Sequence, residues 1–207
     1  SFTKLEIDVR KMKIDLLTLS SHKIYGPKGV GVLYVRQGLK KGLEPLLHGG
    51  GQEGGLRSST VNTAAVAGMA KAVEIGMKEM VTERERLAKL KEKFVEGVLG
   101  KIAGVRVNGS KRKSVSSSVN MSFDRVEGEA ILLSLDAVGI RVSTGSACSS
   151  DDLKPSYVLR AMGYSVARAH GSIRFSWGRW TRKEDIDYVV EMLVKVIKKL
   201  RSLSPIK

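Results

Sequence analysis

The alternation of apolar and polar residues along the chain predicts short strands separated by helices. Apolar runs at residues 13–20 and 30–36 predict two buried strands, joined by a turn that is rich in glycine and proline. Strict alternation predicts a half-buried strand at 115–123. Shorter strands are predicted at 104–109, 139–145 and 170–179.

Helical periodicity fills the intervals between these strands. Small apolar residues predict a helix at 61–78, and a second, amphipathic helix is predicted at about 80–102. The apolar stripe of the second helix comprises Leu87, Leu90, Phe94, Val98 and Ile102. Further helices are predicted at 127–139, at 155–163 and after Thr181. The segment 37–60 is too rich in glycine for a helix and is predicted to be a long loop, of the kind that is either functional or disordered.

This order of elements predicts two units. Residues 1–80 hold two strands, a glycine-rich loop and a helix, which are too few to close a sheet alone. Residues 81–207 are predicted to form an α+β unit with its own core. The first unit therefore looks like the end of a larger domain. The start at Ser1, without an initiating methionine, leads us to expect a processed, trimmed or incomplete chain.

Composition narrows the classes of protein. With 42% hydrophobic and 28% charged residues and no apolar run of about 20 residues, we expect a soluble globular protein without a membrane span. We expect no signal peptide, and a single cysteine excludes an internal disulfide and fits a reducing, cytoplasmic setting. The net charge of +15 suggests nucleic-acid binding as a hypothesis. A content of only 5% aromatic residues, and the mixing of Lys and Arg with Glu at 82–94, disfavour that hypothesis.

Lys23 is the first candidate for chemistry, because it stands where a predicted buried strand ends. An ordinary solvated lysine is the simpler interpretation. Ser20 and His22 flank it, however, and a turn with free backbone N–H groups follows, which together suit a phosphate. A desolvated lysine also forms Schiff bases with carbonyls. A phosphate site beside such an amine suggests pyridoxal phosphate, a phosphorylated aldehyde.

Three other residues are candidates. Cys148 lies in a polar stretch of small residues, which favours a reactive, mobile thiol over a buried, inert one. Thr60 precedes a predicted helix and is interpreted first as its N-cap, second as a phosphate ligand. Arg174 alternates with apolar neighbours on a predicted strand, where it either reaches solvent or binds a carboxylate. Three scattered histidines and one cysteine predict no metal site.

Four motifs together resemble cysteine desulfurases of the NifS/IscS type, in the class V aminotransferase family of pyridoxal-phosphate fold type I. In order, they are SSHKIYGPKGVGVLYVR, HGGGQEGGLRSST, STGSACSSDDLKPSYVLRAMG and HGSIRFSWGRWTRKEDID. The resemblance covers the whole chain and implies an α/β fold. Residues 1–80 would be the remainder of the large cofactor domain, at the end of a mostly parallel sheet. Residues 81–207 would be the small carboxy-terminal α+β domain, with a mobile cysteine loop at 144–155.

The resemblance also implies roles for single residues. Lys23 would bind pyridoxal phosphate covalently and act as the base on the substrate. Ser20, Ser21 and His22 would contact the cofactor phosphate, His22 as a catalytic residue as well, and Thr60 would reach the phosphate of a neighbouring subunit in a homodimer. Cys148 would take sulfur from L-cysteine as a persulfide, leaving alanine. Arg174 would bind the substrate carboxylate.

Partners follow from the same resemblance. A mobile thiol at Cys148 implies delivery of sulfur to an acceptor or iron–sulfur scaffold protein, and allows a transient iron–sulfur contact. An ordinary thiol is only a few per cent ionised at pH 7, so an activating group is expected.

The amino-terminal half of the family supplies the groups that stack on the cofactor ring and pair with its nitrogen, and this chain lacks it. We therefore expect the chain alone to bind cofactor weakly or to be inactive. The alternatives are a truncated, non-catalytic docking module and a selenocysteine lyase of the same fold. An aminotransferase is disfavoured because it does not need the cysteine loop.

Overall fold

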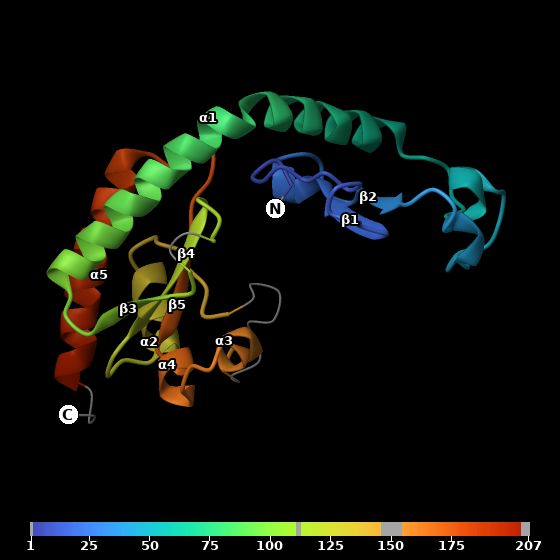
Figure 1. Ribbon diagram of the computed structural model, residues 1–207. Coiled ribbons are helices and arrows are strands. Elements are labelled where there is room, and N and C mark those ends of the chain that lie inside the picture. Colours follow the sequence, from blue (N-terminus) through green and yellow to red (C-terminus); the bar gives the residue numbers. More distant parts are fainter. Residues whose placement is uncertain (1, 111–112, 146–154, 204–207) are drawn as a thin grey trace. The chain divides into compact units, whose positions relative to one another are not determined.

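The computed structural model describes residues 2–110, 113–145 and 155–203 (Figure 1). The chain divides into two compact units, Ser1–Val81 and Thr82–Lys207. Helix α1, Thr63–Lys101, contributes residues to both. In the described part of the chain, no helix is long and apolar enough to cross a membrane, and no three His, Cys, Asp or Glu side chains cluster as metal ligands.

The first unit contains an antiparallel pair of strands, β1 (Leu16–Ser20) and β2 (Gly31–Val35), in which Ser20 pairs with Gly31. A 3-10 helix, η1 (Ser21–Ile24), begins the connection between them. This connection covers residues 21–30 and is shorter than the crossover of about a dozen residues that parallel neighbours require. The two predicted strands are therefore hairpin partners. Segment 37–60 contains only short 3-10 turns, η2 (Lys40–Gly42) and η3 (Gln52–Gly55).

The part of α1 that belongs to this unit packs on the turn after η1. A Cβ atom at Gly68 would lie 2.6 Å from Cγ of Pro27, so the helix and the turn are in close contact there. Ala65 and Met69, on the same side of the helix, are buried. The two helices predicted at 61–78 and 80–102 form one helix of 39 residues, because Lys78, Glu79 and Met80 all favour helix and nothing ends it.

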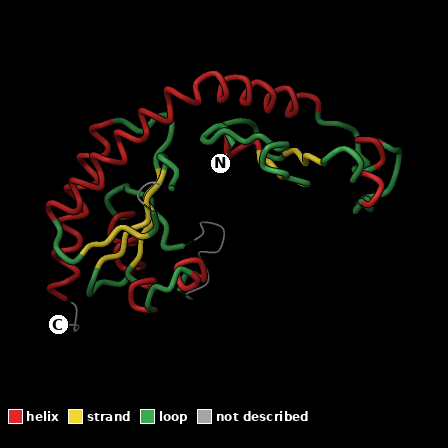
Figure 2. The backbone as a smooth tube through the Cα atoms, viewed as in Figure 1, coloured by secondary structure: helices red, strands yellow, loops and turns green. Residues whose placement is uncertain are grey.

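The second unit is a three-stranded antiparallel sheet in the order β3 (Val105–Asn108), β4 (Ser118–Phe123) and β5 (Ser172–Ser176). Figure 2 shows its strands beside helices of the same unit. One face of the sheet packs on the carboxy-terminal part of α1, on α2 (Gly128–Asp136) and on α5 (Lys183–Leu203). The fully buried members of this core include Phe94, Val98, Met121, Ile131, Leu135, Ile173 and Leu193.

Helices α1 and α5 run side by side in this unit, as Figure 1 shows. A Cβ atom at Gly97 would lie 3.2 Å from a methyl group of Val190, so the missing side chain allows the two helices to approach closely. The predicted stripe from Leu87 to Ile102 is buried along this contact. The hydrophobic periodicity therefore predicted the core correctly.

Two features of the second unit differ from the sequence prediction. The segment 139–145 forms a single β-bridge, between Ser143 and Arg174, and no strand. A short helix, α4 (Val166–His170), follows α3 (Tyr157–Ala161) where no helix was predicted. The fold class is mixed α/β, as predicted, but every strand pair among the described residues is antiparallel, so the expected parallel sheet is not seen there.

Arg86 fastens α1 to the turn that precedes α5. Its guanidinium donates hydrogen bonds to the carbonyl oxygens of Thr181 (2.7 Å), Gly178 (2.9 Å) and Arg179 (3.1 Å). The same group binds both carboxylate oxygens of Glu83, at 2.8 and 2.7 Å. The hydrogen bond from Arg86 lowers the pKa of Glu83, and burial opposes it.

We expect Arg86→Met to lower the free energy of unfolding by roughly 2–3 kcal/mol, because three carbonyls lose a charged donor. Urea unfolding measures this, with Arg84→Gln, at an exposed position of the same helix, as the control that also removes one positive charge. Because the folded-state pKa of Glu83 is lowered, its share of the stability is present above the ordinary carboxyl pKa. It is lost as the pH falls through the lowered value, so the difference between wild type and variant should shrink in acid. A variant as stable as wild type would refute this role.

Candidate active site

The candidate site begins at the turn after β1, which carries Lys23. The turn is closed by two backbone hydrogen bonds, from Ser21 N to the Val30 carbonyl (3.2 Å) and from Gly26 N to the Ser21 carbonyl (3.0 Å). Tyr25 ends η1 in the left-handed conformation, with φ of 68°. Lys23 therefore lies on a short helical turn that backbone hydrogen bonds close.

The side chains of this turn divide into an anchored and an exposed set. Ser21 and Ile24 are buried, at 0% and 7% exposure. Ser20, His22 and Lys23 are exposed. Their side-chain polar atoms make no hydrogen bond or ion pair with other residues in the described part of the chain. A hydroxyl, an imidazole and an amine are therefore available together on one turn.

Two glycines allow the backbone to approach this turn closely. A Cβ atom at Gly26 would lie 2.2 Å from the Ser21 hydroxyl oxygen, and one at Gly31 would lie 2.7 Å from the Leu19 carbonyl oxygen. Any larger residue at either position would have to displace the turn or the strand. These glycines, which the sequence suggested only as turn punctuation, set the position of Lys23.

Ser21 is placed differently from its neighbours. Its hydroxyl is buried and has no hydrogen-bond partner among the described residues, whereas the resemblance implies that it contacts a cofactor phosphate. An unpartnered buried hydroxyl costs about 1–3 kcal/mol.

We expect Ser21→Ala to leave the free energy of unfolding unchanged or to raise it by about 1 kcal/mol, because the lost hydroxyl makes no bond. Thermal unfolding and cofactor titration measure both consequences. Ser20→Ala, at the exposed neighbour, should leave stability alone and weaken phosphate binding. Weaker cofactor binding in Ser21→Ala than in Ser20→Ala would instead make Ser21 a phosphate ligand.

Thr60 lies in the same unit, two residues before the cap of α1. Asn62 caps the helix, because its side-chain oxygen accepts a hydrogen bond from Ala65 N at 3.1 Å. The prediction that Thr60 is the N-cap is therefore wrong. The error arose because Thr and Asn are both good caps and stand two residues apart. Thr60 is exposed and lies two residues before Asn62, which makes the capping hydrogen bond.

Arg174 lies on β5, in the second unit. Its neighbours Ile173 and Phe175 point into the core, at 0% and 3% exposure, and Arg174 points to the opposite face, as the alternation predicts. On β4, Asn120 is its partner in the register. Its backbone exchanges hydrogen bonds with Ser143, at 2.7 and 3.2 Å. This bridge joins Arg174 to the segment that leads into the cysteine motif.

A polar network that the sequence did not predict covers the face next to Arg174. The amide nitrogen of Asn108 donates to Asn120 (2.5 Å) and to Ser122 (2.6 Å). The amide oxygen of Asn108 accepts a bond from Nε of Arg168 at 2.9 Å. The Arg168 guanidinium also lies 3.9 Å from the centre of the Tyr164 ring. The network commits the side-chain oxygen of Asn120 to a hydrogen bond with Asn108.

Cys148, the predicted sulfur acceptor, lies outside the described residues, as does most of the predicted cysteine loop. Ser143, five residues earlier in the sequence, is the last bridge residue before it that the structure describes.

Comparison with known proteins decides the family. The model of the aminotransferase class V family matches residues 1–189. The chain belongs to this family. It is a homologue of cysteine desulfurase IscS: the protein of that name from Dictyoglomus turgidum is 48% identical over 203 residues. The mitochondrial cysteine desulfurase of Arabidopsis thaliana is 50% identical, also over 203 residues. The predicted resemblance is confirmed.

Solved structures of the family agree in fold. A NifS-like protein has a TM-score of 0.85 and 32% identity, over 97% of this chain and 50% of its own. Among the curated relatives, the alignments cover 98% of this chain but 51% of the Dictyoglomus protein and 44% of the Arabidopsis protein. The chain therefore spans about half the length of the curated relatives that it matches.

The residues present fit the cofactor on which this class V family depends. Pyridoxal phosphate needs an amine for its aldehyde and several donors for its phosphate. Lys23 offers the amine, and Ser20 and His22 offer exposed donors on the same turn. A backbone held by two glycines keeps these three groups together.

Proposed function

We propose that this chain supplies the lysine, the thiol and the carboxylate-binding arginine of a cysteine desulfurase. The observation that carries the proposal is the turn at residues 20–23. It presents the amine of Lys23, unpaired among the described residues, on the same turn as two hydrogen-bond donors for a phosphate, Ser20 and His22, in a chain that is 48% identical to a protein named cysteine desulfurase IscS.

In this proposal, Lys23 both attaches the cofactor and acts as a base, and each of the other residues has one role. Pyridoxal phosphate, when bound, supplies an electron sink for the carbon skeleton of the substrate. Ser20 and His22 bind its phosphate, and Thr60 reaches the phosphate bound by a second copy in a homodimer. Arg174 binds the carboxylate of L-cysteine through two parallel N–H donors. Nζ of Lys23 removes the proton from Cα of the substrate.

The thiolate of Cys148 then attacks the sulfur of the substrate. A sulfur–sulfur bond forms as the bond between Cβ and sulfur breaks. The electron pair of that bond stays with the carbon skeleton, which is protonated and leaves as alanine. Forming the persulfide on Cys148 oxidises the sulfur by two electrons, and the Cβ carbon of the substrate takes up both of them, so no external oxidant is consumed. An acceptor or scaffold protein takes the sulfur from it, in a reducing compartment such as the cytoplasm.

The small sheet of the first unit also supports the proposal that an amino-terminal half completes the site. Its sheet has two strands, a number that is marginal without further strands or a covering layer. Leu16, Val32 and Leu33 are each about half exposed on this pair. A missing half that covered these side chains would complete the sheet. It would also bring the ring-binding groups that the described residues do not offer beside Lys23.

The test is a product analysis with the amino-terminal half of a relative supplied as a second chain. L-cysteine should yield equal amounts of alanine and of sulfur carried as persulfide or released as sulfide. Turnover of selenocysteine without turnover of cysteine would favour a lyase. No turnover of either substrate, although the two chains form a complex, would favour a docking module and contradict the proposal.

A further inference from the structure

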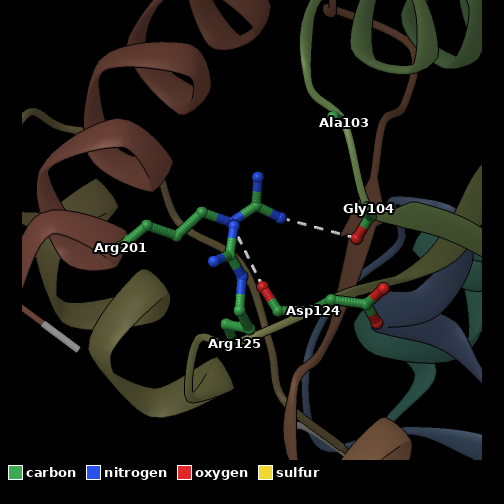
Figure 3. Close-up of a pocket in the computed structure, with 5 residues that line it drawn as sticks. All are labelled: Ala103, Gly104, Asp124, Arg125 and Arg201. Carbon is green, nitrogen blue, oxygen red and sulfur yellow. Dashed lines mark hydrogen bonds between the residues drawn. The ribbon is translucent and has the colours of Figure 1, made fainter. Parts of the chain in front are cut away.

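A pocket of about 270 Å³ lies in the second unit, where β3 begins and α5 ends. Figure 3 shows the residues that line it, which are Ala103, Gly104, Asp124, Arg125 and Arg201. Its residues come from three places in the sequence: the start of β3, the segment after β4 and the last turn of α5. None of them belongs to the proposed desulfurase machinery.

Backbone carbonyls fix the Arg201 side chain at the edge of this pocket. Its Nε donates to the Asp124 carbonyl at 3.1 Å and one terminal nitrogen donates to the Gly104 carbonyl at 3.5 Å (Figure 3). Both acceptors are neutral. The guanidinium therefore keeps its full charge and several free donors, in an orientation that the fold determines.

The negative charge beside the pocket is already engaged. The Asp124 carboxylate forms an ion pair with Arg106, on the neighbouring strand. Within the residues that the structure describes, no carboxylate forms an ion pair with Arg125 or with Arg201. Two arginines, Arg125 and Arg201, thus line one small pocket. The one carboxylate in its lining, that of Asp124, is paired with a different arginine, Arg106.

The lowered pKa of Arg201 is consistent with an excess of positive charge around the pocket. Its pKa is lowered, first by burial and then by the positive charge of Arg125, while the charge of Asp124 opposes this. Arg125 has a backbone φ of 64°, in the left-handed region where a side chain costs about 1–2 kcal/mol relative to glycine. A strained backbone and a like-charge neighbour are both unfavourable, and a bound anion would offset the second of these costs.

We propose that the Arg125–Arg201 pocket binds a small tetrahedral oxyanion of the phosphate or sulfate class. Arginine presents planar, forked donors that match oxyanions, and two of them can each contribute two bonds. The pocket volume exceeds the roughly 30 Å³ that one water occupies in the liquid, so it admits such an ion with part of its hydration. The bound anion would offset the repulsion between the two guanidiniums.

The probe is inorganic phosphate, titrated into the full 207-residue chain at constant ionic strength with chloride as the balance. Backbone amide shifts in NMR spectra locate the ion, which separates this pocket from the turn at residues 20–23. The proposal predicts saturable shifts at Gly104, Arg125 and their neighbours. Sulfate should cause the same shifts, and acetate should need a clearly higher concentration.

Arg125→Gly is the decisive variant, because glycine suits the left-handed backbone and keeps the fold. It should weaken phosphate binding at these amides at least about tenfold, since one or two charge-assisted bonds are lost. Without phosphate it should melt at a higher temperature than wild type. Arg125→Asn should weaken phosphate binding to the same extent, because asparagine also tolerates this backbone conformation.

Arg84→Gln removes the same charge from an exposed position in the same unit and should leave phosphate binding unchanged. Linear, unsaturated shifts in the wild type would overturn the proposal. So would shifts that persist in Arg125→Gly, or shifts confined to the turn at 20–23. Acetate binding as tightly as phosphate would contradict the preference for a tetrahedral ion. No assay here uses cysteine or cofactor, so the result is independent of the proposed desulfurase activity.

Discussion

Lys23→Ala is expected to abolish covalent cofactor attachment and to lower desulfurase turnover by about 10²–10⁴-fold, the usual contribution of a positioned acid–base group. The amine of Lys23 is exposed, and no ion pair within the described residues engages it. It is therefore free both to attach the cofactor and to take the Cα proton. The measurement is borohydride reduction in the presence of the amino-terminal half, followed by mass spectrometry of the labelled peptide.

Lys28→Ala is the matched control, because Lys28 is an exposed lysine on the connection between the same two strands. It should keep the label and the turnover. A label found on Lys28, or found on any lysine of the Lys23→Ala variant, would contradict the assignment. Restoration of some turnover by added primary amines in Lys23→Ala would support a role in proton transfer.

Cys148→Ala is expected to lower sulfur removal by about 10³-fold or more, because the nucleophile that receives the sulfur is gone. Cofactor absorbance should be unchanged, since no phosphate donor or amine is altered. The chain contains one cysteine, so any persulfide on it must lie at this position. Mass spectrometry of the wild type after one turnover should show the mass of one added sulfur atom.

Cys148→Ser is the control for the size and polarity of the side chain, and it should be as inactive as the alanine variant. Turnover of L-cysteine at the wild-type rate by either variant would contradict a persulfide on this chain. A selenocysteine lyase that uses no persulfide would instead keep its turnover of selenocysteine in both variants. The two outcomes therefore separate the leading proposal from its alternative.

The sequence predicted best what depends on local periodicity. The stripe from Leu87 to Ile102 repeats every three or four residues, and these residues are buried as expected. The alternation around Arg174 likewise predicted its side of the sheet. By contrast, the strand expected at 139–145 reduces to the single bridge at Ser143, because pairing depends on how far the partner strand extends.

The sequence predicted which residues make up the candidate site, but not how their side chains are arranged. The motif at residues 20–23 identified Lys23, yet only the 3-10 turn determines that Ser21 is buried while Ser20 and His22 are exposed. The Asn108 network and the Arg125–Arg201 pocket join residues far apart in the sequence. No local pattern predicts such convergence, because it arises from tertiary packing alone.

The central claim is that this chain holds one part of an active site that another half must complete. Cofactor absorbance tests it most directly, by titrating pyridoxal phosphate into the chain alone and into the chain with the amino-terminal half of a relative. The account predicts weak binding and no alanine release from the chain alone, and tight binding with alanine release once the second half is present. Strong, stable yellow colour together with alanine release from the purified 207-residue chain alone would contradict it.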